Sequence, residues 1–158
     1  MTASGVEVEV EDEAWSSALP DAEHLARAAA SGALDLAEET GGVVVLLTGD
    51  DEVAALNGAF RDKPGPTNVL SFPAAPNPED HLGDIALAFG VCAREAGEQG
   101  KTLAHHLQHL VAHGVLHLVG YDHQTDSEAE EMEALERRIL ERLGAPDPYA
   151  SEQDEGHG

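Results

Sequence analysis

Three histidines in the C-terminal half of the chain are spaced as ligands of one metal ion. They are His113, His117 and His123, in the segment HGVLHLVGYDH. Two histidines four residues apart on a helix project from one face, so their imidazole rings can reach a common ion. Gly120 can adopt the left-handed conformation that ends a helix, which would let His123 turn back toward the other two. Three nitrogen ligands suit zinc and leave a position for water, as in catalytic zinc sites.

Gly114 narrows the chemistry that such an ion could support. Metallopeptidases of the HExxH type carry a glutamate at this position as general base, and this chain has none there. Either another residue activates the water, or the ion acts mainly by lowering the pKa of its water and by polarising an anionic substrate. Phosphodiester hydrolysis fits the second option. Another divalent metal remains compatible with the spacing, because imidazole ligands also suit nickel and its neighbours.

His109 lies one helical turn before His113 and could face the same site. Two interpretations are open for it. It could be an outer partner of a metal ligand or a proton shuttle. It could equally be a side chain on the helix surface.

The composition is that of one acidic, compact domain. The chain has 158 residues, with eight Lys and Arg against 31 Asp and Glu, which gives a formal charge of -23. This charge disfavours nonspecific binding to nucleic acid or anionic membrane. The single cysteine, Cys92, is expected to be a small buried thiol. No signal peptide or long apolar run is present, so we expect a cytoplasmic protein without membrane contact.

Hydrophobic periodicity predicts an α+β fold. Apolar residues alternate or run together in segments typical of strands and recur with helical spacing elsewhere. The strands are expected at 6–10, 43–47, 68–72 and 84–89, and the helices at 20–39, 50–60, 91–99, 102–119 and 127–143. We therefore predict a single domain over residues 1–145, with a mixed sheet of about four strands and about five helices. The strands at 68–72 and 84–89 are expected to pair antiparallel. Residues 146–158 are predicted to be an acidic, disordered tail.

The helix ends carry their own signals. Thr102 is a plausible N-cap of the histidine helix. Ser127 and Glu130 would form a capping box at the start of the last helix, and Gly144 would end it. The apolar stripe of that last helix is expected to pack on the protein's own core rather than to form a partner groove; it comprises Met132, Leu135, Ile139 and Leu143.

Three blocks of the sequence together resemble one family. They are NGAFRDKPGPTNVLSFP at 57–73, LGDIAL at 82–87 and HLVAHGVLHLVGYDH at 109–123. In order and spacing they are similar to the signature blocks of the YbeY-type rRNA maturation endoribonucleases. The resemblance implies a zinc-dependent enzyme that cleaves single-stranded RNA, acts in 3' end maturation of small-subunit (16S) rRNA, and serves ribosome quality control. It also implies small ribosomal subunit proteins and a ribosome-assembly GTPase as partners.

The resemblance assigns residues as well. It implies that His113, His117 and His123 bind one zinc ion per chain, and that Arg61 contributes to activity together with His113. A guanidinium group matches a phosphate and could stabilise charge that develops during cleavage. Asp84 could orient a histidine or act as base, and a turn-closing role is as plausible. Three residues of the first block are expected mainly to fix the loop and strand: Thr67, Asn68 and Ser71.

The chain departs from the family pattern in the loop after Arg61. Where the family usually has Asp-Lys-Pro-Thr, this chain has Pro64-Gly65-Pro66-Thr67, and Lys63 could replace the missing positive charge. The charge of -23 should also repel RNA unless salt, divalent ions or a ribosomal protein compensates for it. Two alternatives to the endoribonuclease therefore stay open. One is a non-catalytic ribosome-assembly factor with a structural zinc, and the other is a metal-dependent hydrolase of another bond.

Overall fold

The computed structural model of the chain describes residues 6–39, 41–61, 67–75, 78, 81–121 and 125–145, with the backbone alone at 59–61. The four strands are β1 (Val6–Val10), β2 (Gly42–Thr48), β3 (Val69–Pro73) and β4 (His81–Ala88). The helices are α1 (Glu13–Ala18), α2 (Ala22–Leu36), α3 (Asp50–Arg61), α4 (Phe89–Gln99), α5 (Leu103–Leu118) and α6 (Asp126–Arg142).

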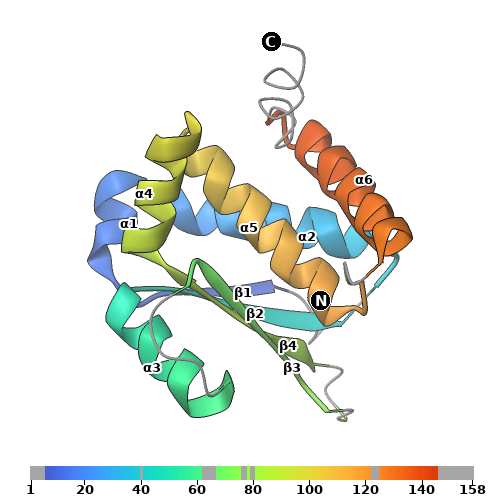
Figure 1. Cartoon of the computed structure of the whole chain (residues 1–158), viewed down its shortest axis with the longest axis horizontal. Coiled ribbons are helices and arrows are strands. Elements are labelled where there is room, and N and C mark those ends of the chain that lie inside the picture. Colours follow the sequence, from blue (N-terminus) through green and yellow to red (C-terminus); the bar gives the residue numbers. More distant parts are fainter. Residues whose placement is uncertain are drawn as a thin grey trace.

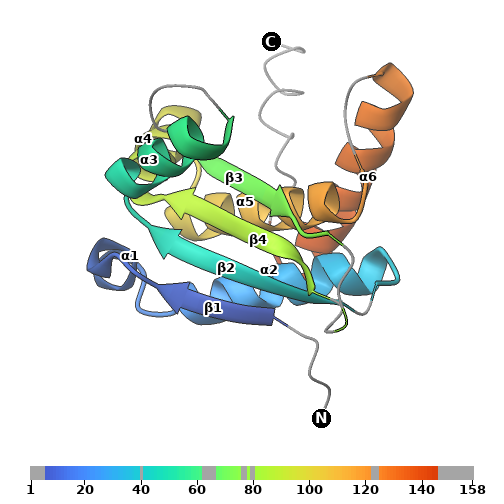
Figure 2. The same cartoon turned by 90° about the horizontal axis from the view of Figure 1, so that it is seen from below.

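The strands form one mixed sheet in the order β1-β2-β4-β3. β1 pairs parallel with β2, and β2 pairs parallel with β4. β3 runs antiparallel to β4, with Ser71 opposite Ile85. Figure 2 shows this order and the single reversed strand at one edge. The predicted α+β fold with a four-stranded mixed sheet is confirmed, including the antiparallel pair.

The helices divide unequally between the two faces of the sheet. In Figure 1, α3 lies below the sheet and the other helices lie above it. Alternate residues of a strand point to opposite faces. Val45 and Ile85 accordingly belong to the main core with α2 and α5, whereas Leu46 and Ala86 pack in a smaller cluster with Val53 of α3.

α1 was not among the predicted helices, so the described chain has six helices instead of about five. The helix has only six residues, which is too short for a clear periodic pattern. Tertiary contacts hold it instead. The indole of Trp15 is fully buried, donates a hydrogen bond to the carbonyl oxygen of Thr48 at 2.9 Å, and meets the ring of Phe89 edge-on.

The start of α6 also differs from the prediction. Thr125, and not Ser127, caps the helix, and Glu128 completes the capping box in place of Glu130. The Thr125 hydroxyl accepts a hydrogen bond from the Glu128 amide, and the Glu128 carboxylate accepts one from the Thr125 amide. Both residue pairs match the capping-box pattern, and the earlier pair adds two residues to the helix. The predicted end is confirmed, because α6 stops at Arg142 and Gly144 has a φ of 80°.

The predicted domain boundary at residue 145 is still a prediction, because the tail, 146–158, lies outside the described residues. No helix in the described part of the chain combines the length and apolar character needed to cross a membrane.

Cys92 confirms the expectation of a buried thiol, since the residue has no solvent exposure. Burial, together with the nearby carboxylates of Glu95 and Asp50, raises the pKa of the thiol to about 12.

Thiolate is the reactive form, so folded protein at pH 8 should react with iodoacetamide at least about 100-fold more slowly than protein unfolded in urea. Mass spectrometry of the alkylated chain would measure both rates. Equal rates would show that the thiol is accessible in solution.

Candidate functional site

α5 carries two of the three predicted metal-binding histidines, His113 and His117, and packs on β3 and β4 of the sheet. Thr102 caps it as predicted, since the Thr102 hydroxyl accepts a hydrogen bond from the His105 amide at 3.1 Å. One side of the helix, including Val111 and Val115, is fully buried in the main core. The polar side keeps His113 and His117 partly exposed. The amphipathic pattern of the helix therefore fixes which way these two histidines face.

Gly114 lies at a close approach of α5 to β4. A Cβ atom at this position would be 3.0 Å from Cδ1 of Ile85, which is tighter than ordinary van der Waals contact. The Ser71 hydroxyl of β3 donates a hydrogen bond to the Gly114 carbonyl oxygen at 3.4 Å. Position 114 thus faces the sheet. This explains physically why it carries no side chain, and a glutamate there would not point to the same side as the histidines.

His113 and His117 converge through their outer nitrogens. Nε2 of His113 and Nε2 of His117 lie 3.1 Å apart, and the two rings are nearly perpendicular at 82°. Two nitrogen ligands on a tetrahedral zinc ion, each about 2.0–2.1 Å from it, would be roughly 3.3 Å apart. The spacing of four residues therefore brings the two nitrogens to the separation that a shared ion requires.

Glu136 of α6 lies behind this pair. Its Oε2 is 2.8 Å from Nδ1 of His113, and its Oε1 is 2.7 Å from Nε2 of His109. The side chain is only 1% exposed. Burial raises the pKa of the carboxyl, but the hydrogen bonds from His109 and His113 outweigh it and lower the pKa to about 2. The carboxylate is therefore ionised at neutral pH and accepts a hydrogen bond from each ring.

Glu136 is not among the site residues predicted from the sequence. The apolar stripe of α6 was expected to pack on the core, which is confirmed for the fully buried Met132 and Ile139. Glu136 lies on the same stripe, four residues after Met132 and three before Ile139. A carboxylate in the middle of an apolar helix face was the available signal, because buried acids are rare unless they are paired.

α5 ends at Leu118, just before Gly120, as the sequence predicts. The Gly120 amide donates to the His117 carbonyl oxygen, and the Tyr121 amide donates to the Leu116 carbonyl oxygen. Gly120 has a φ of 107°, which few other residues adopt. This pair of hydrogen bonds is a Schellman motif, and it turns the chain sharply away from the helix axis. The chain that leads to His123 therefore begins next to His117.

The structure does not describe the side chains of two predicted site residues, His123 and Arg61. His123 is not among the described residues, and for Arg61 only the backbone is described, at the end of α3. Among the residues that the structure describes, no group of three or more His, Cys, Asp or Glu is arranged to hold a metal. The third ligand and the arginine remain predictions.

The structure places His109 and Asp84 differently with respect to the histidine pair. His109 is 13% exposed and shares the Glu136 carboxylate with His113, so it does not lie on the helix surface. Asp84 precedes Ile85, which faces α5, and strand alternation therefore directs Asp84 to the opposite face of the sheet. Its carboxylate is 2.7 Å from Nε2 of His81.

Asn68 has the structural role that its sequence block, 57–73, predicts for it. Its side-chain amide donates to Oε1 of Glu95 at 3.0 Å, and its side-chain oxygen accepts from the Val69 amide. Glu95 is also 3.0 Å from Nε2 of the buried His106. Burial lowers the pKa of His106. These contacts join the start of β3 to α4 and α5.

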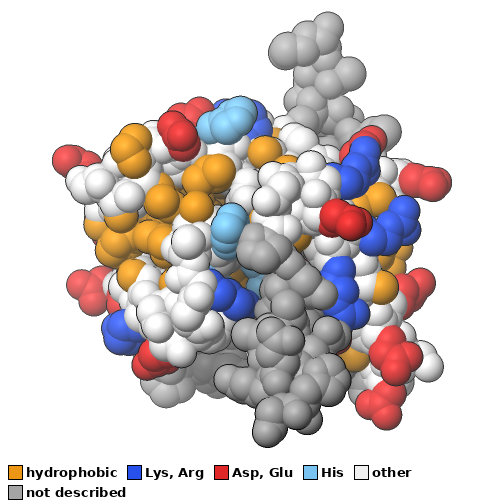
Figure 3. All heavy atoms as spheres, turned by 90° about the horizontal axis from the view of Figure 1, so that it is seen from above, with side chains coloured by type: hydrophobic (Ala, Val, Ile, Leu, Met, Phe, Trp, Pro, Cys, Tyr) orange, Lys and Arg blue, Asp and Glu red, His pale blue; other side chains and the backbone are white. Residues whose placement is uncertain are grey.

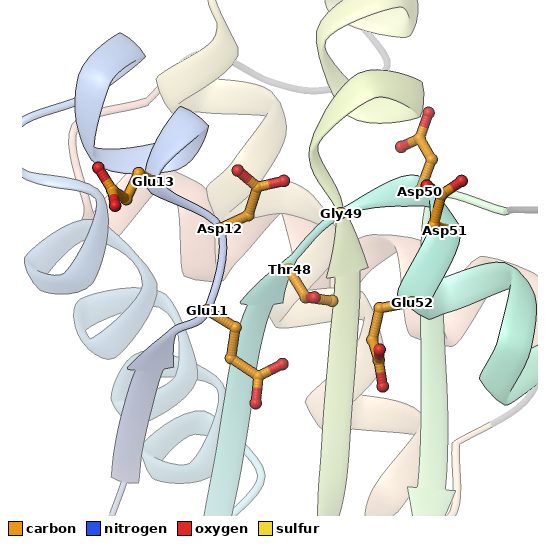
Figure 4. Close-up of a pocket in the computed structure, with 8 residues that line it drawn as sticks. All are labelled: Glu11, Asp12, Glu13, Thr48, Gly49, Asp50, Asp51 and Glu52. Atoms are coloured by element: carbon orange, nitrogen blue, oxygen red, sulfur yellow. The ribbon is translucent and has the colours of Figure 1, made fainter.

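A separate acidic pocket lies at the carboxyl ends of β1 and β2. It has a volume of about 550 Å³ and is lined by Glu11, Asp12, Glu13, Thr48, Gly49, Asp50, Asp51 and Glu52 (Figure 4). Two of its carboxylates are already used by the backbone. Asp12 accepts from the Ala14 amide, and Asp50 accepts from the Val91 amide of α4. The pocket contains none of the histidines of the candidate site.

The fold and the site together define a single-domain α+β protein with a centre of histidines and one carboxylate between α5 and α6. The family model for Endoribonuclease YbeY matches residues 7–144. Endoribonuclease YbeY of Maricaulis maris is 53% identical over 156 residues, covering 98% of this chain and 97% of that protein. The Azorhizobium caulinodans protein of the same name is 52% identical over 153 residues, covering 92% and 96%. This chain belongs to the Endoribonuclease YbeY family.

A solved structure supports the same fold. The solution structure of a Thermotoga maritima protein superimposes with a TM-score of 0.56 at 25% sequence identity, covering 87% of this chain and 91% of that one. The resemblance noted from the three sequence blocks is therefore confirmed by whole-chain comparison.

The packing of Gly114 leads to a testable expectation. Gly114→Glu should lower the free energy of unfolding by about 3 kcal/mol or more, because it forces a charged side chain between α5 and Ile85. Urea unfolding followed by circular dichroism would measure the change. Gly97→Glu is the matched control, since a Cβ at this helical position meets nothing within 4 Å. If both variants unfold like the unmodified protein, the close approach of α5 to β4 is not a real constraint.

Proposed function

We propose that this chain is a zinc-dependent endoribonuclease that cleaves single-stranded RNA and acts in 3' end maturation of small-subunit (16S) rRNA. The observation that carries the proposal is the approach of Nε2 of His113 to Nε2 of His117 at 3.1 Å, in a member of the Endoribonuclease YbeY family. A role in ribosome quality control is part of the same proposal.

The donor set favours zinc. Neutral imidazole nitrogens are common zinc ligands, and a ligand histidine usually donates its other N–H to a carboxylate or carbonyl group. His113 fits this pattern: its Nε2 faces His117 and is available for the metal, and its Nδ1 faces the Glu136 carboxylate. We propose His123 as the third ligand. A zinc ion with three protein ligands would keep one coordination position for water and would lower the pKa of that water. It would also act as a Lewis acid toward the scissile phosphate.

Protein side chains would bind the substrate and hold the metal ligands in place. The Glu136 carboxylate would accept the hydrogen bond from Nδ1 of His113, 2.8 Å away. Arg61, at the end of α3, would bind the phosphate and stabilise its developing negative charge through a planar guanidinium group. The described residues identify no general base; the Asp84 carboxylate lies 2.7 Å from Nε2 of His81.

The charge distribution bears on how RNA reaches the centre. Figure 3 looks onto the helix-covered side, where histidine side chains are visible together with several Lys and Arg side chains. Three of the eight basic residues of the chain lie on α6: Arg137, Arg138 and Arg142. One of them, Arg142, pairs with Asp35 of α2. The same helix carries seven acidic residues, so these arginines reduce its negative charge without reversing it.

We further propose that the partners of the chain include small ribosomal subunit proteins and a ribosome-assembly GTPase. Many ribosomal surfaces are basic, and the acidic pocket at β1 and β2 would not repel them as it repels RNA. The same pocket favours a second candidate function. A ribosome-assembly factor with a structural zinc would need an acidic docking surface and no catalysis.

One experiment separates the two candidates. Zinc-loaded protein should cleave a single-stranded RNA oligonucleotide, as measured by gel electrophoresis of end-labelled RNA. His117→Ala should lose both bound zinc and activity, because it removes one of the two converging nitrogens. Arg61→Ala should keep the zinc and lose activity by at least about 100-fold, since it removes charge stabilisation alone. Bound zinc is quantified in each preparation by elemental analysis.

Two variants control for changes in charge and helix composition. His105→Ala changes a histidine near the start of α5, and Arg94→Ala removes an exposed arginine of α4. Both should cleave RNA like the unmodified protein. If the unmodified protein binds one zinc per chain but leaves RNA intact, the assembly-factor proposal replaces the endoribonuclease proposal.

A further inference from the structure

We propose that Glu136 is a positioning residue that selects the hydrogen-bonding form of His113, and that His109 holds Glu136 in place for this task. The inference rests on the proposed function in one respect, since it assigns Nε2 of His113 to the metal. It adds a residue from a different helix, α6, to the metal-binding histidines that the sequence places on α5 and in the segment after it.

The geometry determines the state of the His113 ring. A neutral histidine carries its hydrogen on Nδ1 or on Nε2, and the partner of one nitrogen decides the state of the other. A carboxylate only accepts hydrogen bonds. Because Oε2 of Glu136 is 2.8 Å from Nδ1 of His113, the hydrogen must be on Nδ1. Nε2 is then left with a lone pair, and it is the nitrogen that faces His117 at 3.1 Å.

His109 restricts the carboxylate itself. A glutamate side chain has three rotatable bonds, so a single contact would leave its orientation variable. The second oxygen, Oε1, is 2.7 Å from Nε2 of His109, one helical turn before His113. The two rings lie 6.4 Å apart and nearly perpendicular, at 78°. Both oxygens are therefore held by the same helix, and the carboxylate plane is fixed relative to α5.

Burial of Glu136 strengthens the preference for one hydrogen-bonding form of His113. The Glu136 side chain is 1% exposed, and its neighbours on α6, Met132 and Ile139, are fully buried apolar residues. Water cannot readily replace a missing partner in such surroundings, so an alternative form of His113 would leave the carboxylate incompletely hydrogen-bonded. The energetic difference between the two ring forms is thereby larger than it would be at an exposed site.

A purely structural role is the alternative interpretation. In that case Glu136 would only join α6 to α5, and its replacement would lower stability without changing His113. The two interpretations differ in what they predict for folded protein. Positioning predicts a change in the His113 ring and in zinc affinity for every folded molecule, whereas a structural role predicts neither.

The test uses Glu136→Gln and Glu136→Met in the full chain. Met has a similar length and no acceptor oxygen, and Gln keeps the shape but lacks the negative charge. In chelator-treated, ¹⁵N-labelled unmodified protein, correlation spectra of the imidazole nitrogens should show His113 with hydrogen on Nδ1. In Glu136→Met the hydrogen should move wholly or partly to Nε2. The His113 signals are identified by their loss in His113→Ala.

Zinc affinity is the second readout. Competition with a chromogenic chelator should show binding weaker by about 10–100-fold in both variants, the range expected when a carboxylate partner of a ligand histidine is lost. Glu141→Gln is the matched control, since it removes one exposed carboxylate from the same helix. It should change neither readout. Circular dichroism establishes that each variant is folded at the temperature used.

The outcomes separate this inference from the proposed function. If the unmodified protein binds zinc and both variants bind it equally well with His113 unchanged, the positioning role is wrong and the zinc proposal stands. If the unmodified protein binds no zinc, the zinc proposal fails, and the spectra of metal-free protein still decide the positioning role. Should Glu136→Met fail to fold, Glu136→Gln decides the question through the zinc measurement.

Discussion

The site depends on one buried carboxylate. The Glu136 side chain is only 1% exposed, and an ionised carboxylate would be strongly unfavourable there without partners. The two histidine N–H groups of α5 compensate for this cost, and they lower the pKa of the carboxyl to about 2 despite burial. The interaction joins α5 and α6 at a fixed rotation about their axes. The direction of the histidine rings therefore depends on the packing of a helix that contains none of them.

The sheet sets the second constraint. α5 is clamped between β4 on one side, through Gly114 and Ile85, and α6 on the other, through His113 and Glu136. The close contact at Gly114 limits how far α5 can move toward the strands, because protein interiors are close-packed with few voids. The Ser71 hydrogen bond to the Gly114 carbonyl oxygen adds a polar contact at the same point. The histidines are thus presented by a helix with both of its sides fixed.

Much of the fold could be predicted from the sequence because the hydrophobic periods are regular. All four strands and five of the six helices follow from alternation and helical spacing, and Gly120 marked the end of α5. α1 could not be predicted, since six residues around one Trp form a helix only through tertiary contacts. The histidine spacing predicted the pair at 113 and 117. Glu136 is 23 residues from His113, and periodicity cannot show which buried position of one helix faces a given ring of another.

The place of α6 in the chain has a consequence for biosynthesis. Proteins emerge from the ribosome from the N-terminus onward, so the sheet, α2 and the histidine helix are complete in the nascent chain before Glu136 is made. During that interval the α5 histidines lack the carboxylate that orients them, and one face of α5 lacks its apolar cover. The last of the described helices to be synthesised is therefore the one that completes the centre, so the centre can form only after that helix has been made.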